Sequence, residues 1–208
     1  MTRFWDDADP AWRECFELAW ESFRAGSIPI GAVLVDEGGV IVARGRNRSG
    51  EAAAPGGQIA GSNVAHAELN ALAALPPGEY RDHVLYTTLE PCFLCTAALR
   101  HSHVGTVRYA APDPVWAGVT ELPGLNEHLA RRWTRRDGPL AGPLRDLAAT
   151  LHLVSAMERG IEAVVDCHQQ ALPDIVRIAR KLTGPTADDL RRLSLSDALG
   201  RIPLPAAG

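Results

Sequence analysis

Residues 85–95, LYTTLEPCFLC, decide the architecture of this chain. The first five residues are rich in β-branched and aromatic side chains, which favours a strand. Cys92 then opens a largely apolar segment that runs to His101 and is predicted to be a helix. A strand that leads directly into a helix is typical of an α/β fold, and ligands bind at the carboxyl ends of such strands. The segment therefore places two cysteines, Cys92 and Cys95, at a sheet edge.

The alternation of strands and helices continues on both sides of this unit. His66-Ala67-Glu68 stands near the start of a helix predicted over residues 64–75, which a Pro-Pro-Gly sequence ends. The other elements expected here are an amphipathic helix over 9–24, a β-hairpin formed by 30–35 and 40–46, and a strand over 104–110. This order implies a layered α/β fold with some parallel strand pairing.

The remaining segments are less regular. Residues 47–63 are rich in Gly, Ser, Ala and Pro and are expected to form a long loop. A loop over 112–123, a helix over 125–132 and a short edge strand over 133–135 follow. From about residue 141 the pattern becomes helical, with helices expected over 143–158, 161–182 and 187–199, and with Pro173 kinking or splitting the second. We therefore expect one domain over residues 1–140 and a helical C-terminal extension over 141–208.

The overall composition restricts the class of protein. With 46% hydrophobic residues, the 208-residue chain can bury a substantial core. Its N-terminus lacks the apolar segment of a signal peptide, and no apolar run approaches the roughly 20 residues of a membrane span. These features predict a cytoplasmic protein with no membrane partner. The net charge of −4 argues against a large nucleic-acid footprint, because such footprints usually need a basic face.

Cysteine usage agrees with a reducing compartment. Four cysteines in 208 residues are too few for a disulfide scaffold, and Cys15 and Cys167 fit mostly apolar helical patterns as core thiols. The Cys92-x-x-Cys95 pair could be a redox motif. The upstream His-x-Glu motif and the proline before Cys92 favour metal binding instead.

His66, Cys92 and Cys95 supply three ligands of the types that bind zinc. Structural zinc sites usually have four protein ligands, whereas catalytic sites leave the fourth position to water. The pKa of such a water falls to roughly 7. Glu68 could then accept the proton of that water and return it to a ring nitrogen and to a leaving amine. The four residues together are the parts needed to make a hydroxide at neutral pH.

Each of these residues also has an ordinary structural interpretation. His66 could bond to the backbone at a helix start, and Glu68 could be a first-turn acid favoured by the helix dipole. The two cysteines could be half of a structural zinc site, with a fourth ligand among His83, His101, His103 and Cys167. The occurrence of all four residues in this order, at predicted helix starts, favours the catalytic interpretation.

The motifs resemble those of the cytidine deaminase-like superfamily, in particular its branch of bacterial tRNA adenosine deaminases, guanine deaminases and fungal-type cytosine deaminases. The resemblance runs from about residue 29 to residue 118. It rests on PIGAVLV at 29–35, GRNR at 45–48, AHAELNAL at 65–72, LYTTLEPCFLC at 85–95 and HSHVG at 101–105. The extension from residue 141 lies outside it.

The resemblance implies a three-layer α/β/α sandwich with a five-stranded mixed sheet, often as a homodimer. It implies zinc bound by His66, Cys92 and Cys95, with Glu68 as the catalytic proton shuttle. It also implies two substrate contacts, the side chain of Asn47 and the backbone N–H of Ala67. On its own, Asn47 could equally be a turn residue that tolerates a positive φ.

The chain departs from the sequence pattern of this branch at positions where the resemblance implies substrate contact. The usual Asp-Pro-Thr before Ala-His-Ala-Glu is replaced by Ser62-Asn63-Val64, and His-Ser-Arg becomes His101-Ser102-His103. The loop over 47–63 is also longer. Because of these departures, the sequence does not identify the base that is deaminated.

The main basic cluster is formed by four arginines, at 131, 132, 135 and 136, around Trp133. In an RNA-binding interpretation the arginines contact phosphates and Trp133 stacks on a base. In the simpler interpretation the cluster is a solvated face with one buried Trp, which base rates favour.

We therefore expect a zinc-dependent hydrolytic deaminase that converts a ring C–NH2 to C=O and releases ammonia from a small nucleobase-like or nucleoside-like substrate. The first alternative is a tRNA adenosine-to-inosine deaminase, in which nucleic acid is the partner. The second belongs to another class, a zinc-stabilised binding protein without catalysis.

Overall fold

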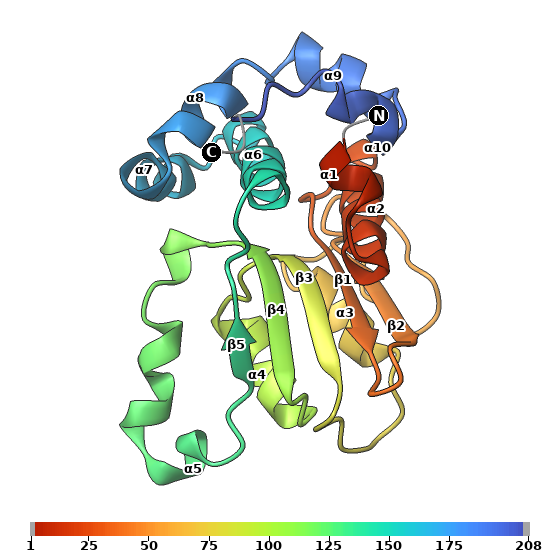
Figure 1. Ribbon diagram of the computed structural model, residues 1–208, viewed down its shortest axis with the longest axis vertical. Coiled ribbons are helices and arrows are strands. Elements are labelled where there is room, and N and C mark those ends of the chain that lie inside the picture. Colours follow the sequence, from red (N-terminus) through yellow and green to blue (C-terminus); the bar gives the residue numbers. More distant parts are fainter. Residues whose placement is uncertain (1–2, 206–208) are drawn as a thin grey trace.

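The computed structural model describes residues 3–205. At its centre lies a five-stranded sheet with the strand order β2-β1-β3-β4-β5 (Figure 1). Strand β1 pairs antiparallel with β2 and β3, whereas β3, β4 and β5 are mutually parallel neighbours. The strands are β1 (Gly31–Val35), β2 (Ile41–Arg46), β3 (Val84–Leu89), β4 (Thr106–Ala111) and β5 (Arg135–Asp137). The predicted mixed sheet of five strands is confirmed.

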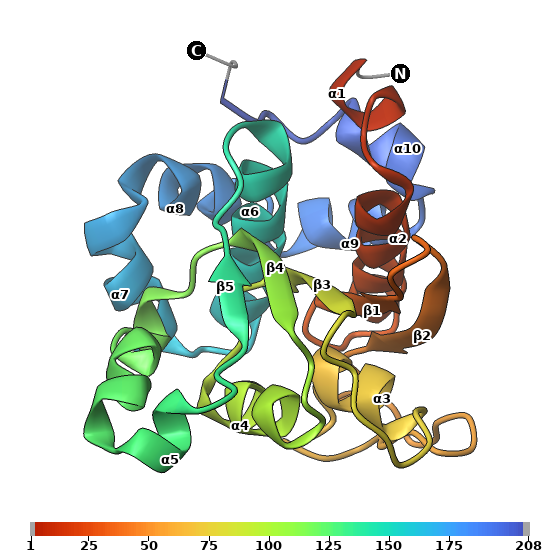
Figure 2. The same ribbon diagram turned by 60° about the horizontal axis from the view of Figure 1, so that its bottom comes forward.

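Helices cover both faces of this sheet, as Figure 2 shows. One face carries α2 (Pro10–Arg24) and α6 (Pro143–Glu158), and the other carries α3 (Ala67–Ala73) and α4 (Phe93–His101). Both faces can be covered because successive side chains of β1 point to opposite faces of the sheet. Val33 and Val35 pack with the α2 and α6 core, whereas Ala32 and Leu34 pack with the α3 and α4 core. The three-layer α/β/α sandwich is therefore confirmed.

The amphipathic helix α2 begins where the sequence predicts. The Asp9 carboxylate caps it by accepting a hydrogen bond of 2.8 Å from the Ala11 N–H, and Pro10 occupies the first turn. Its aromatic side chains Trp12, Phe16 and Trp20 are buried in the core above β1 and β3.

The C-terminal helices pack on the same side of the sheet as α2. Helix α6 lies against β4 and β3, and the last two helices lie over the end of α2 in Figure 1. Trp20 Nε1 on α2 donates to the Leu193 carbonyl, between these two helices, at 3.1 Å. The later helices are α7 (Glu162–Ala171), α8 (Pro173–Arg180), α9 (Pro185–Arg191) and α10 (Leu195–Leu199). Their buried side chains share one core with α2.

Two of the predicted C-terminal helices are divided. The segment 161–182 splits before Pro173, which begins α8 at a position where its missing N–H costs no hydrogen bond. The predicted single helix over 187–199 was wrong. Ser194 has an extended backbone and accepts a hydrogen bond from the Asp197 N–H at 3.2 Å, so it caps a new helix, α10.

Other boundaries also shift. The helix predicted over 64–75 begins only at Ala67, and the loop predicted over 112–123 contains two 3-10 turns, η1 (Pro114–Trp116) and η2 (Val119–Leu125). Only α5 (Glu127–Ala130) is helical within 125–132, and the edge strand lies at β5 rather than at 133–135. A short N-terminal helix, α1 (Arg3–Asp6), was not predicted. Within residues 3–205, no helix is both long enough and apolar enough to span a bilayer.

The close packing of β2 against α3 generates a stability prediction. A Cβ added at Gly45 would lie 2.2 Å from both the Ala67 carbonyl oxygen and the Ala71 nitrogen, so only glycine fits there. We expect Gly45→Ala to lower the free energy of unfolding by about 1–3 kcal/mol, because overpacking forces α3 away from the sheet. Gly124→Ala is the matched control, since its added Cβ meets no atom within 4 Å in the described structure. Equal urea midpoints for Gly45→Ala and wild type would contradict this packing.

Candidate metal and catalytic site

Two helix starts meet at the carboxyl end of β3. His66 is the N-cap residue of α3, and Cys92 is the N-cap residue of α4, both with extended backbones. One turn into α4, Cys95 faces the same point, and its backbone N–H donates to Cys92 Sγ at 3.5 Å. The predicted helix starts therefore bring these three side chains together, as the sequence indicates.

The three side chains form a group that could hold a metal ion. Their ligand atoms all lie within 4.8 Å of one another. His66 Nδ1 is 3.3 Å from Cys95 Sγ and 3.6 Å from Cys92 Sγ. Tetrahedral zinc with bonds of about 2.0–2.1 Å to nitrogen and 2.3 Å to sulfur places N and S roughly 3.6 Å apart. The spacing of these donors therefore fits zinc.

The pKa values of the two thiols are shifted in opposite directions. A hydrogen bond from Cys95 and a further one with His66 lower the pKa of Cys92 to about 4, despite its burial. The hydrogen bond with Cys92 raises the pKa of His66. The separate hydrogen bond between Cys95 and Cys92, together with burial, raises the pKa of the Cys95 thiol. The lowered pKa favours the thiolate form of Cys92, which is the form that binds a metal ion.

None of the fourth ligands considered for a structural zinc site joins this group within residues 3–205. His103, for example, contacts Glu79 at 3.1 Å at the surface. The described group is therefore limited to three residues, the number typical of a catalytic zinc site.

Glu68 lies beside the group but outside it. Its side chain is only 3% exposed, Thr87 Oγ1 donates to Oε1 at 3.1 Å, and Cys95 Sγ donates to Oε2 at 3.4 Å. Burial and the nearby charge of Cys92 raise the pKa of the Glu68 carboxyl. A carboxyl with a raised pKa is suited to accept and return a proton near neutral pH.

A cavity of ≈190 Å³ opens onto these groups. His66, Glu68 and Cys92 line it together with Asn47, and the C-terminal helices contribute His152 from α6 and Val164 from α7. The C-terminal extension therefore forms part of the cavity wall.

Asn47 lies in a turn at the cavity wall, and its φ is not positive. Its side chain is 1% exposed and lines the cavity, and its Oδ1 accepts hydrogen bonds from the Ser49 N–H at 3.0 Å and the Ser49 hydroxyl at 2.8 Å. Its carbonyl accepts from the Ser22 hydroxyl at 2.8 Å. The turn bonds therefore hold the residue at the cavity wall.

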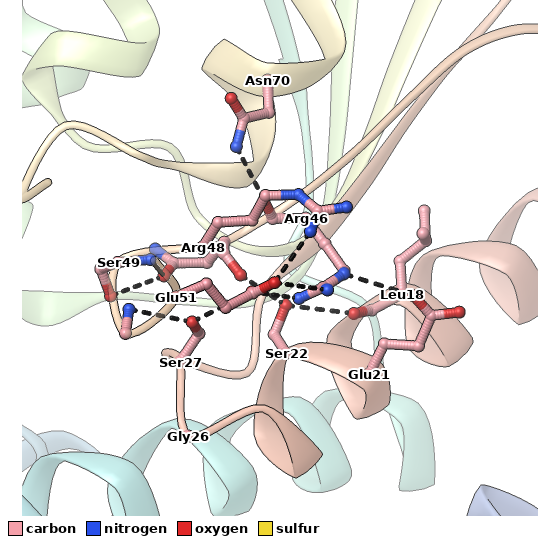
Figure 3. A network of polar contacts seen from close by, with 12 residues as sticks. Leu18, Glu21, Ser22, Gly26, Ser27, Arg46, Arg48, Ser49, Glu51 and Asn70 are labelled. Carbon is pink, nitrogen blue, oxygen red and sulfur yellow. Dashed lines mark hydrogen bonds and ion pairs between the residues drawn. The ribbon is translucent and has the colours of Figure 1, made fainter. Parts of the chain in front are cut away.

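Figure 3 shows a polar network that fixes the loop after β2 and that the sequence analysis missed. The Glu51 carboxylate accepts from Arg46 at 2.5 and 2.8 Å and from Arg48 at 2.8 Å. The Ser27 hydroxyl adds a contact of 3.3 Å, and Asn70 Nδ2 on α3 donates to the Arg46 carbonyl at 3.0 Å. The start of the long loop is thus tied to α2, β2 and α3.

A second buried group was also missed. Asp113, His152 and His168 each offer a ligand atom within 4.8 Å of the others. Burial raises the pKa of Asp113 to about 7. Burial, with a smaller contribution from the charge of His168, lowers the pKa of His152 to about 3. These residues come from a loop and two helices far apart in sequence, so no local motif identifies them.

The arginines around Trp133 do not form one basic face. Arg136 points inward, where it pairs with Glu90 at 2.8 Å and is only 7% exposed. Arg131 and Arg132 are exposed, at 79% and 57%, and line a surface hollow with Arg100 and two histidines.

Comparisons with known proteins agree with this geometry. The family model described as "Cytidine and deoxycytidylate deaminase zinc-binding region" matches residues 6–111. A tRNA(Ile)-lysidine synthase of Deinococcus radiodurans is 36% identical over 145 residues, which is 65% of this chain and 23% of that protein. A tRNA-specific adenosine deaminase of Haemophilus influenzae is 38% identical over 105 residues, 49% of this chain and 56% of that protein.

The chain thus spans less than two thirds of the length of either relative. A solved structure from a study of "A-to-I Editing by tRNA:A34 Deaminases" superposes with a TM-score of 0.51 at 27% identity. The match covers 68% of this chain and 97% of that one. The donor group has the spacing that zinc needs, the fold matches, and the family model covers half of the chain. The chain therefore belongs to the family described by the cytidine and deoxycytidylate deaminase zinc-binding region.

Proposed function

We propose that this protein is a hydrolytic deaminase of a small nucleobase-like or nucleoside-like substrate. The observation that carries the proposal is the ≈190 Å³ cavity in which the buried Glu68 and the metal-ligand group meet. Pockets for drug-sized ligands have volumes of roughly 300–1,000 Å³, so this cavity suits a single ring system. The substrate would carry an amino group on a ring carbon next to a ring nitrogen.

His66, Cys92 and Cys95 would hold the zinc. When bound there, zinc lowers the pKa of a coordinated water to roughly 7, and this supplies a nucleophile at neutral pH. The contribution of the chain is to offer one imidazole and two thiols at helix starts, where partial positive charge favours the thiolate form.

Glu68 would move the protons. It accepts a proton from the attacking water and delivers it to the ring nitrogen of the substrate. It then passes the second proton of that water to the amino group, which leaves as ammonia, while the C–N bond breaks and C=O forms. Thr87 orients the carboxyl through its hydrogen bond to Oε1.

Two further groups would bind the substrate ring. The N–H of Ala67 is in the first turn of α3, where backbone donors have no partner within the helix. Asn47 lies on the cavity wall and is held there by its own turn. Residues 1–140 would thus carry the chemistry, and the extension over 141–208 would complete the cavity through His152 and Val164.

A homodimer and a cytoplasmic location are part of the proposal. Phe93 and Leu94 at the start of α4 are 43% and 44% exposed, and Val64, just before α3, is 44% exposed. The adjacent exposed apolar side chains of Phe93 and Leu94 favour a protein partner, for which we propose a second copy. The free thiols fit a reducing compartment.

A tRNA adenosine deaminase is the second candidate. It is favoured by the similarity to the tRNA-specific adenosine deaminase of Haemophilus influenzae and to the solved structure from the study of tRNA:A34 deaminases. The exposed side chains of Arg131 and Arg132 also favour it. Against it stand the net charge of −4 and the inward position of Arg136.

A substrate panel separates the two candidates. Ammonia release would be measured with zinc-loaded protein on free bases, nucleosides, nucleotides, amino-pterins, triazines and a tRNA anticodon stem-loop. We expect release from one small compound, because the cavity holds a single ring system. Release from the stem-loop alone would overturn the proposal in favour of tRNA editing, and loss of activity as salt rises would accompany it.

Glu68→Gln tests the proton shuttle. The amide keeps the shape of the side chain but cannot accept a proton, so we expect turnover to fall by about 10²- to 10⁴-fold with zinc content unchanged. Glu121→Gln, at an exposed position, is the control. A Glu68→Gln protein with wild-type turnover would refute the mechanism.

Thr87→Val tests the orientation of Glu68. Valine has the same shape but removes the 3.1 Å hydrogen bond to Oε1. A hydrogen bond to a charged group is worth about 1.5–3 kcal/mol, so we expect kcat to fall roughly 10- to 100-fold. Thr87→Ser, which retains the hydroxyl, should recover most of this loss. Equal kcat values for Thr87→Val and Thr87→Ser would show that the bond does not matter.

A further inference from the structure

A second group of metal-ligand residues lies where the C-terminal helices meet the sheet. Asp113 follows β4, His152 is on α6 and His168 is on α7. One ligand atom from each lies within 4.8 Å of the other two. In Figure 1, α6 and α7 lie side by side beyond the upper end of β4. All three residues lie outside the segment 6–111 that the family model matches.

The surroundings of His168 fix its tautomer. The residue is fully buried, and its Nδ1 lies 2.9 Å from the Val164 carbonyl oxygen. A carbonyl only accepts, so Nδ1 carries the hydrogen and Nε2 keeps a free lone pair in the neutral ring. Nε2 is itself buried, and it has no hydrogen-bond partner in the described part of the chain. Metal-binding histidines commonly have this arrangement, with a backbone carbonyl holding the far nitrogen.

His152 is even less satisfied. Both of its ring nitrogens are buried, and neither has a hydrogen-bond partner among residues 3–205. Its ring centre lies 5.4 Å from that of His168, with 47° between the ring planes, so the two imidazoles are not stacked face to face. Buried polar atoms are almost always paired in native proteins. Three unpaired ring nitrogens on two touching histidines therefore call for a partner between them.

Asp113 supplies the negative charge. Its side chain is 4% exposed, and its Oδ1 accepts from the Val115 N–H at 3.1 Å. Its backbone N–H donates to Glu90 Oε2 at 3.1 Å, which fixes the residue at the end of β4. The carboxylate is thereby held next to the two imidazoles.

We propose that Asp113, His152 and His168 form a second site for a divalent transition-metal ion. Two imidazoles and one carboxylate suit ions such as zinc, iron or nickel, and the set is harder than the imidazole and two thiols of the first group. The ion would satisfy the unpaired nitrogens and would join α6 and α7 to the end of β4. Because Asp113 and His152 also line the cavity beside Glu68, the ion would fix the part of the cavity wall that the C-terminal extension provides.

Metal stoichiometry tests this proposal independently of any activity. The protein would be stripped with a chelator, reloaded with Zn2+, freed of excess metal by gel filtration and analysed by mass spectrometry. We expect two zinc ions per chain in wild type, one in His152→Leu and one in Cys92→Ser, which removes a ligand of the first group. His128→Leu, at an exposed histidine outside both groups, is the control and should keep two.

Thermal unfolding gives a second readout. In the absence of an ion, His152→Leu removes two unpaired polar atoms and should raise Tm, whereas with the ion it removes a ligand. We expect the rise in Tm on adding Zn2+ to be smaller in His152→Leu than in wild type. Asp113→Asn, which keeps the shape of the side chain, should also bind one zinc ion and covers the case in which His152→Leu does not fold.

Two results would overturn the second site. One is a single zinc ion in wild type together with a higher Tm in His152→Leu, which would identify the histidines as a packing pair. The other is two zinc ions in wild type that persist in both His152→Leu and Asp113→Asn, which would place the additional ion elsewhere.

Discussion

The convergence of two helix starts at the carboxyl end of β3 is the constraint on which the rest of the structure depends. His66 and Cys92 each cap a helix, so their side chains leave the backbone before the first turn and meet a few ångströms apart. This meeting requires α3 and α4 to lie on the same face of the sheet, which the alternation of β1 and the absence of a side chain at Gly45 allow. Glu68 follows from the same geometry, since it is in the first turn of α3 and is buried against Thr87.

The sequence predicts the sheet and the metal-ligand group well because each strand, helix and motif involved depends on residues that are close together in the sequence. Hydrophobic periodicity predicts α2 and the five strands to within a few residues, and the His-x-Glu and Cys-x-x-Cys spacings identify the three donors that the fold brings together. Asn47 lines the cavity and its side chain makes turn bonds, but its φ is not positive as the simpler interpretation expected.

The features that the sequence did not predict depend on contacts between distant segments or on single capping bonds. Ser194 divides a predicted helix through one hydrogen bond, and no periodicity reveals it. The group of Asp113, His152 and His168 draws on a loop and two helices, with each histidine on a helix face that resembles an ordinary core position. The contribution of the C-terminal helices to the cavity arises because α6 packs on β3 and β4, whose ends carry the site.

Anomalous diffraction at the zinc edge from crystals of the zinc-loaded protein tests the central claim most directly. The account predicts a peak bonded to His66 Nδ1 and to both sulfurs of Cys92 and Cys95, at about 2.0–2.1 Å and 2.3 Å, with a non-protein fourth ligand and with Glu68 uncoordinated. A fourth protein ligand on that ion, or no peak at these three residues, would contradict the account and would leave Glu68 without a catalytic role.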